Sequence, residues 1–324
     1  MKLDATIACD PVAGAALAAG LEADGYDGVW TAETQHDPFL PLATAAVSTS
    51  SVTLGTAIAT AFTRSPMVTA MASWDLQRAS RGRFVLGLGT QVRAHNVRRF
   101  SVPWEAPAPR LRELVEALRH IWGAFQGEHP MRFRGAYYRH DLMTPFFDPG
   151  PIEWPAPPIW LAAVTPTMYK LAGEVADGIH VHVFHTARYL REVALPALGS
   201  RRSELTLASG VFVVLGGAAD DVRLQIAFYG STPTYRPVFE VHGWDGLQEK
   251  LHGLMAQGDF AGMAAAIDDE VLAEFAVLAD DWDDAWRQIR RRYDGILDRV
   301  GVYGHRSSAG ANTKEIAEAF RRTA

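Results

Sequence analysis

The sequence predicts an α/β protein of the (β/α)8 TIM-barrel class, in which parallel strands alternate with helices around a closed sheet. Short apolar strand-like runs alternate with amphipathic helical runs, and about eight such units can be assigned along the chain. No internal repeat or low-complexity linker divides the 324 residues. An open doubly wound sheet is the alternative architecture. We expect a single domain, 1–324, with insertions after the fourth and seventh strands, at about 127–158 and 230–274.

The first half of the chain shows the alternation most clearly. The helix predicted over Arg110–Phe125 carries Leu111, Leu114 and Leu118 at helical spacing. The four predicted strands are Leu3–Cys9, Asp27–Glu33, Val52–Thr60 and Arg83–Thr90. The helices that follow them are Pro11–Asp24, Leu40–Ser50, Pro66–Ala79 and Arg110–Phe125.

The alternation is interrupted at Gly127–Pro158, a segment rich in Pro, Gly and aromatic residues that predicts an inserted hairpin and irregular loop. Gly230–Glu274 predicts a second, largely helical insertion. The remaining predicted strands are Ile159–Val164, Gly178–Phe184, Leu205–Leu215 and Arg299–Tyr303. The remaining predicted helices are Pro166–Ala176, Ala187–Leu198, Trp282–Arg292 and Thr313–Arg322.

Composition excludes several classes of protein. A net charge of −6 argues against a general nucleic-acid binder, because neutralising phosphates requires surplus Lys and Arg. The single cysteine, Cys9, excludes an internal disulfide framework. No apolar run is long enough to cross a membrane, and the N-terminus is typical of a first strand, not of a signal peptide. We therefore expect a cytoplasmic protein with no membrane partner.

A glycine-rich turn, Gly87-Leu88-Gly89-Thr90, ends the fourth predicted strand and precedes a basic segment. It lacks the third glycine of a dinucleotide fingerprint and does not follow the first strand, which argues against a Rossmann site. Two interpretations stay open. Either the glycines only allow neighbouring elements to approach, or Thr90 and nearby backbone N–H groups bind a phosphate with help from Arg93 or His95.

Two histidine-bearing strand ends are further candidates. Glu33 and His36 follow the second strand, where either could act as an acid or base, although the segment could equally be a solvated loop and a helix cap. His180 and His182 share one face of the sixth strand. No carboxylate at ligand spacing accompanies them, so we expect no metal and interpret them as polar residues lining one side of a cofactor cleft.

Four stretches together resemble the bacterial-luciferase-like (β/α)8 superfamily, and specifically its coenzyme F420-dependent oxidoreductases, in a largely uncharacterised subgroup. They are Asp27–Glu33 (DGVWTAE), Leu54–Gln91, the segment beginning VRAHNVRRFSVPWEAPAPR together with LMTPFF, and Ala162–His182 with its AGEVADG sequence. The resemblance covers essentially the whole predicted barrel. It implies a deazaflavin cofactor lying across the mouth of the barrel.

The resemblance also implies which residues hold that cofactor. In the family a non-prolyl cis peptide ends the third strand behind the ring system, which corresponds to Ala57–Ile58 here, and Thr60 follows beside the ring. Gly89, Thr90 and Gln91, with Ala163, Val164 and Thr165, match the turns that bind the cofactor's phosphate-bearing tail, and Arg93 and His95 are added from the adjoining segment.

The activity implied is hydride transfer between the deazaflavin and a small organic substrate, with Glu33 or His36 exchanging the proton. The group acted on, CH–OH or C=C or C=N, stays open. Sugar-phosphate-oxidising members carry an Asp-His pair at the end of the second strand. Here Glu33-Thr34 occupies those positions, which argues against that mechanism. An FMN-dependent monooxygenase on the same fold and a non-catalytic dimeric barrel without flavin are the alternatives.

Two further expectations follow from the resemblance. Aromatic residues of the insertions are candidates for shaping an apolar substrate pocket: Trp104, Tyr137, Tyr138, Phe146 and Phe147. Family members are usually homodimers through helices of the first half, and the Ala-rich helices at Leu40–Thr49 and Pro66–Ala79 suit close packing between subunits.

Overall fold

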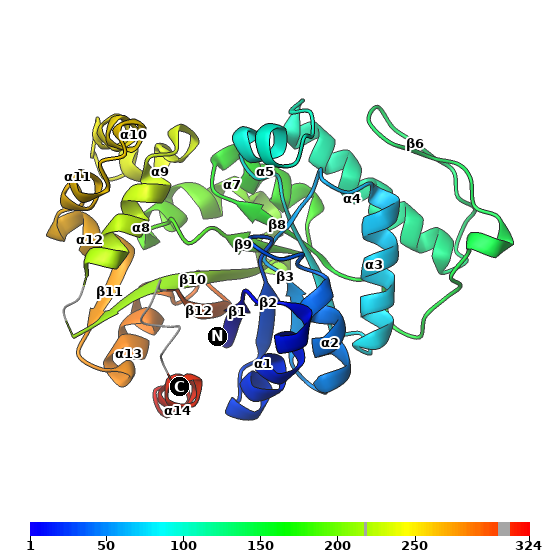
Figure 1. The fold of residues 1–324 in the computed structure, drawn as a ribbon, viewed down its shortest axis with the longest axis horizontal. Helices are drawn as coiled ribbons and strands as arrows, with labels where there is room; N and C mark the ends of the chain where they lie inside the picture. The colour runs from blue at the N-terminus through cyan, green and yellow to red at the C-terminus, as the bar shows by residue number, and fades with distance from the viewer. Residues whose placement is uncertain (217–218, 304–311) are drawn as a thin grey trace.

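A closed parallel barrel forms the centre of the molecule in the computed structural model, which describes residues 1–216, 219–303 and 312–324 (Figure 1). Within these ranges eight strands close the ring in the order β1-β2-β3-β5-β8-β9-β10-β12, and β12 returns to pair with β1. Their bounds are β1 Lys2–Ile7, β2 Gly28–Thr31, β3 Thr53–Thr56, β5 Phe84–Gly89, β8 Ile159–Ala163, β9 Gly178–Val181, β10 Thr206–Leu215 and β12 Arg299–Tyr303. The predicted fold class is confirmed.

The helices that cover the barrel begin and end close to their predicted positions. Local chemistry explains their ends: the Asp10 side chain accepts hydrogen bonds from Val12 and Ala13 N–H, and Gly25 ends the first helix in the left-handed region, with φ of 93°. The covering helices are α1 Pro11–Asp24, α2 Leu40–Ser48, α3 Pro66–Ala79, α4 Pro107–Phe125, α5 Pro166–Val175, α6 Ala187–Tyr189, α7 Leu195–Ala197, α13 Trp282–Tyr293 and α14 Thr313–Arg322.

Two excursions leave the barrel toward opposite sides of the molecule in Figure 1. The first is a hairpin made of β6 (Phe133–Arg134) and β7 (Arg139–His140), as predicted. The second is the helical group of α8 Asp220–Gly230, α9 Pro237–Glu240, α10 Leu247–Gln257, α11 Phe260–Ala265 and α12 Asp269–Phe275. It begins about ten residues earlier than predicted. It ends in a strand that the sequence did not predict, β11 (Ala276–Ala279). This strand pairs with the C-terminal part of β10, from Phe212 to Leu215.

The predicted third strand, Val52–Thr60, is divided in two. β3 pairs with β5 at Leu54 and Gly55, and the pairing resumes only at β4 (Ala59–Thr60). Between them the Thr56 hydroxyl donates to the Gly87 carbonyl at 2.6 Å and accepts from the Gly87 N–H at 2.9 Å. One side chain therefore satisfies the backbone groups that the interrupted ladder leaves without partners.

Gly87 is required here because there is no room for a side chain. A Cβ at this position would lie 1.8 Å from the Thr56 carbonyl oxygen and 2.8 Å from His180 Nε2. A Cβ at Gly89 would likewise lie 2.8 Å from the Ile58 side chain. These contacts show that both glycines allow neighbouring elements to approach closely.

We expect Gly87→Ala to lower the free energy of unfolding by roughly 1–3 kcal/mol, because the backbone of β3 or β5 must move to accept the methyl group. Gly20→Ala is the matched control. Gly20 lies within α1, and no heavy atom lies within 4 Å of an added Cβ. We therefore expect the free energy of unfolding of this variant to rise by roughly 1 kcal/mol, because alanine favours the helix over glycine. Urea denaturation of the three proteins measures both changes. A Gly87→Ala protein as stable as the parent would contradict the packing described here.

Candidate functional site

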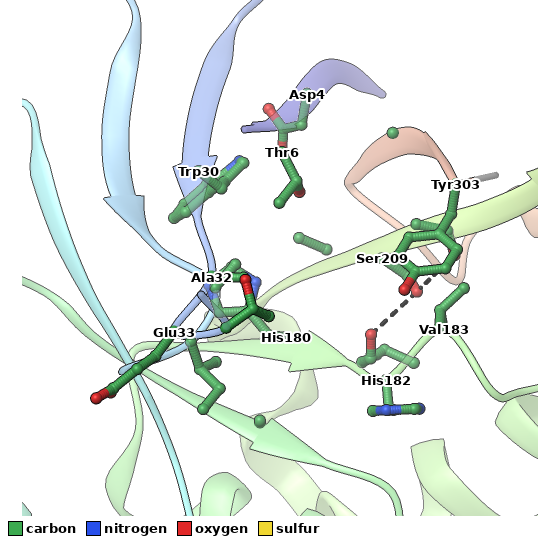
Figure 2. A pocket seen from close by; sticks show the side chains of 18 of the residues that line it. Asp4, Thr6, Trp30, Ala32, Glu33, His180, His182, Val183, Ser209 and Tyr303 are labelled. Atoms are coloured by element: carbon green, nitrogen blue, oxygen red, sulfur yellow. Dashed lines mark hydrogen bonds between the residues drawn. The ribbon is translucent and has the colours of Figure 1, made fainter. Parts of the chain in front are cut away.

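A cavity of about 280 Å³ lies where the barrel strands end at their carboxyl termini (Figure 2). Strands β1, β2, β9, β10 and β12 and the segment between β3 and β4 all contribute to its lining, and α8 adds one side chain. The lining residues include Asp4, Thr6, Trp30, Ala32, Glu33, Ala57, Ile58, Gln91, Ala162, His180, His182, Ser209, Gly210, Tyr229 and Tyr303.

Aromatic side chains form the floor of this cavity. The His180 ring lies against both Trp30 and Trp160, with ring centroids 4.7 and 5.0 Å apart, and the two tryptophans are 5.0 Å from each other. Beneath them Arg299 and Asp4 form a buried ion pair with contacts of 2.6 and 2.9 Å, and the Arg299 guanidinium lies 5.6 Å from the Trp30 ring. Because Asp4 also reaches the cavity lining, this ion pair and the aromatic rings together bound the cavity on this side.

Small residues stand one inward position above the floor. Side chains on a strand face the same side every second residue, so Trp30 is followed inward by Ala32 and Trp160 by Ala162, whereas His180 is followed by His182. Each of these small residues lines the cavity. The change from large to small residues leaves an open layer above an aromatic floor, which is the shape that a planar ring system fits.

The predicted cis peptide is present between Ala57 and Ile58, and both residues line the cavity. Hydrogen bonds hold this segment on the β2 side. Ala57 N–H donates to the Thr31 carbonyl at 2.7 Å, and the Ile58 carbonyl accepts from Glu33 N–H at 3.1 Å. The cis peptide bond therefore lies at the position that the family resemblance implies.

Glu33 braces the same segment with its side chain. Its carboxylate accepts the Thr60 N–H at 2.6 Å and lies 3.0 Å from Arg64 Nη1, while Arg64 also contacts Asp37 at 2.6 Å. Figure 2 shows the Glu33 carboxylate directed away from His182, Ser209 and Tyr303. Glu33 thus lines the cavity, with its carboxylate engaged by the Thr60 N–H and by Arg64.

The other candidates on this side occupy different positions. His36 lies on an exposed loop and does not line the cavity. Thr60 is buried beside the Glu33 carboxylate, and its hydroxyl has no hydrogen-bond partner among the described residues. It lies behind the Ala57–Ile58 segment and not on the cavity surface.

The two turns predicted to bind a phosphate lie side by side, because β5 and β8 are hydrogen-bonded neighbours. Gln91, in the left-handed region with φ of 56°, lines the cavity, and the Asn96 side-chain amide donates to the Thr90 carbonyl at 2.8 Å. Ala163 ends β8, and Val164 and Thr165 lead from it into the N-terminus of α5, for which Thr165 is the cap. Arg93 and His95 are exposed on the helical turn after Gln91.

The opposite wall carries polar groups that the sequence analysis did not single out as site residues, apart from His182. Ser209 comes from β10, Tyr303 from β12, and Tyr229 from α8 in the second insertion. No sequence motif marks these residues. Strand ends are expected to meet at the mouth of the barrel, and this expectation points to Tyr303 at the end of β12. It does not point to Tyr229, which lies in a helix.

The aromatic residues proposed to shape a substrate pocket do not line this cavity, so that hypothesis was wrong. Trp104 packs edge-on against Phe62, and the Tyr138 hydroxyl accepts a hydrogen bond from Arg110 at 3.0 Å. Phe146 and Phe147 are 89% and 69% exposed on the hairpin side of the molecule. The proline-rich insertion folds away from the barrel mouth, toward α3 and α4 (Figure 1).

Burial among apolar and aromatic groups keeps three histidines neutral. It lowers the pKa of His180 to about 3, with a smaller contribution from the Arg299 charge. It lowers the pKa of His182 and of His185 to about 4 each. Within the described ranges no three His, Cys, Asp or Glu side chains gather as metal ligands. No helix in those ranges combines the length and apolar character needed to cross a bilayer.

These pKa values predict loss of stability in mild acid. Between about pH 6.5 and pH 4 the unfolded chain binds more protons than the folded chain, so the free energy of unfolding falls as the pH falls. Each histidine contributes up to roughly 1.4 kcal/mol per pH unit in this window. Urea denaturation at several pH values from 7 to 5 measures the slope.

His185→Asn is the informative variant. His185 Nδ1–H donates to the His182 carbonyl at 2.8 Å, and an asparagine amide can take over that bond without titrating. We expect the slope to decrease by roughly the share of one histidine. An unchanged slope would show that His185 is not held neutral in the folded protein.

Comparison with known proteins agrees with this arrangement. The model of a family described as luciferase-like monooxygenase matches residues 9–299. An uncharacterized protein of Mycobacterium tuberculosis (strain ATCC 25618 / H37Rv) is 47% identical over 316 residues, covering 93% of this chain and 92% of that protein. A 5,10-methylenetetrahydromethanopterin reductase of Archaeoglobus fulgidus is 28% identical over 274 residues, covering 79% of each chain.

Among solved structures, the coenzyme F420 dependent tetrahydromethanopterin reductase from Methanopyrus kandleri superimposes with a TM-score of 0.78. The match covers 98% of this chain and 96% of that one at 23% identity, which establishes likeness of fold. The family match extends over nearly the whole chain, from within the β1–α1 region to the start of β12. The chain therefore belongs to the luciferase-like monooxygenase family.

Proposed function

We propose that the protein is a coenzyme F420-dependent oxidoreductase that transfers a hydride between the deazaflavin and a small organic substrate. The observation that carries the proposal is the open layer above the Trp30–His180–Trp160 floor, bounded by small residues and adjoining two neighbouring strand-end turns. The reductase of Archaeoglobus fulgidus, 28% identical, supports hydride chemistry of this type.

The residues present fit such a cofactor. Ala57, Ile58 and Gln91 would contact the ring system, because they line the β3–β5 side of the cavity. Gly89 and Thr90 at the end of β5, and Ala163, Val164 and Thr165 between the end of β8 and α5, would bind the phosphate of the tail, because these strand ends are neighbours and the dipole of a helix N-terminus favours an anion. The exposed Arg93 and His95 would add charge at the same edge.

When bound, the deazaflavin supplies a carbon that accepts or donates a hydride. The protein's part is to orient the two reactants and to exclude water. The aromatic floor closes the cavity from below. We infer that Glu33 holds the Ala57–Thr60 segment in place and is not the group that exchanges the proton, because its carboxylate is already bound to Thr60 N–H and Arg64.

An FMN-dependent monooxygenase is the second candidate, since the family description itself names monooxygenases. Fluorescence titration of the purified protein with F420 and, separately, with FMN distinguishes the two. We expect F420 to bind; micromolar or tighter binding of FMN without binding of F420 would establish the alternative. A non-catalytic barrel is disfavoured by the open cavity, and it would bind neither cofactor.

A substitution at the β5 turn tests the placement of the tail. Thr90→Asp puts a negative charge beside the proposed phosphate, and we expect F420 affinity to fall at least tenfold by electrostatic repulsion. Thr90→Asn is the matched control, because asparagine has nearly the shape of aspartate but no charge. Its affinity for F420 should fall much less. Equal affinities of the two variants would remove this turn from the cofactor site.

We also infer a homodimer formed through the first-half helices, which stand side by side on one flank of the barrel (Figure 1). Their outer surfaces expose large apolar side chains that a partner subunit would cover: Val12, Leu17, Leu40, Val47, Val68 and Met71. Light scattering should give twice the chain mass. The double variant Val68→Glu, Met71→Glu should be monomeric, whereas the double variant Phe146→Glu, Phe147→Glu should stay dimeric. The reverse pattern would place the interface on the hairpin.

A further inference from the structure

The wall of the cavity made by β9, β10, β12 and α8 carries polar side chains that the proposed cofactor site does not use. Figure 2 shows His182, Ser209 and Tyr303 gathered on this side, across the cavity from Glu33. Tyr229 completes the group, and its hydroxyl lies 2.7 Å from the Tyr303 hydroxyl. The proposed cofactor contacts lie between β3 and β4 and at the ends of β5 and β8, so this wall is left for the substrate.

The two tyrosine hydroxyls form a pair that always keeps one proton to donate. Each hydroxyl has one O–H and can also accept. Whichever tyrosine donates within the pair, the O–H of the other is left over, together with free lone pairs. Burial raises the pKa of Tyr229 well above its usual value, so its hydroxyl stays protonated at neutral pH. The pair can thus both donate to and accept from one oxygen of a ligand.

The neighbouring groups support this pair without competing with it. His182 Nδ1 accepts the Phe184 N–H at 3.1 Å, so the neutral ring carries its proton on Nε2. Its ring meets Tyr229 edge-on at 4.8 Å. The Ser209 hydroxyl lies 3.0 Å from the Val181 carbonyl, and a serine has a single proton to donate. The tyrosine pair and His182 Nε2–H are then the donors left on this wall.

The charges around the cavity select against an ionic substrate. Among the described lining residues, the carboxylates are Asp4 and Glu33, which are paired with Arg299 and Arg64. No lysine or arginine is present among those lining residues. Among these described residues an iminium substrate meets no unpaired anion, and a phosphorylated or carboxylated substrate meets no cation. The wall therefore suits a neutral molecule with one hydrogen-bonding oxygen.

We propose that the hydroxyl pair of Tyr229 and Tyr303 binds the reacting oxygen of a neutral ketone or secondary alcohol and exchanges its proton. This inference rests on the proposed function, which supplies the hydride. In the reducing direction the hydride forms the new C–H bond, the π electrons of the C=O bond move to oxygen, and that oxygen takes the outward O–H proton. A solvent proton then restores the tyrosine. Oxidation of an alcohol moves the same atoms in reverse.

Paired ligands that differ only at the oxygen test the binding step. Protein saturated with F420 is titrated with acetone, cyclohexanone and acetophenone, and with the alkenes in which a CH₂ group replaces each carbonyl oxygen. We expect at least one ketone to bind about tenfold more tightly than its alkene, since a buried hydrogen bond is gained. The preference should disappear in a Tyr229→Phe, Tyr303→Phe double variant.

Tyr235→Phe is the matched control, because Tyr235 packs against His182 in the same cluster at 5.1 Å but does not line the cavity. It should keep the full preference for the ketone. Thermal melting and F420 affinity establish that each variant folds. For a ketone that is reduced, each single Tyr→Phe variant should lower kcat by roughly 10²-fold or more while F420 affinity is unchanged.

The outcomes separate this inference from the proposed function. Failure of the parent protein to bind F420 would overturn the proposed function, and this inference with it. Binding of F420 with no ketone preferred over its alkene would overturn the inference alone. A preference that survives in the double variant would likewise show that the tyrosine pair does not bind the oxygen.

Discussion

The layer formed by Trp30, His180 and Trp160 determines where this barrel is filled and where it is open. These three rings lie within 5.0 Å of one another by centroid, and Trp30 and His180 line the cavity. Tight packing around them requires glycine at positions where a Cβ would strike a ring, as at Gly55 against Trp30 and Gly178 against Trp160. Two of the three next inward residues on the same strands, Ala32 and Ala162, are small, and they line the cavity above Trp30 and Trp160.

Most of the fold could be predicted from the sequence because each unit carries strong local signals. The bounds of α1, α3 and α14 agree with prediction to the residue, since each has a capping residue and a sharp end. β11 was missed because it is only four residues long and follows a helix directly, without turn residues. The division of the third strand depends on the Thr56 hydroxyl bonding across to Gly87, a long-range contact that no local pattern encodes.

The candidate site was predictable on one side only. Small residues and turns after β3, β5 and β8 follow a family pattern, so Ala57, Ile58 and Gln91 could be named in advance. Glu33 was correctly placed at the cavity, but its engagement by Arg64, 31 residues further along the chain, could not be read from spacing. Tyr229 lies in a helical insertion whose packing angle decides whether its hydroxyl reaches Tyr303. That angle depends on tertiary contacts, for which a single sequence carries no direct signal.

The ion pair between Asp4 and Arg299 joins the first and last strands of the ring across 295 positions of the chain. During synthesis on a ribosome the Asp4 carboxylate therefore lacks this partner until Arg299 has emerged. Burying a carboxylate without a partner costs free energy. We therefore expect Asp4 to stay hydrated until Arg299 is available. Pairing of β1 with β12, which closes the ring, therefore also brings together the two charges of this buried ion pair.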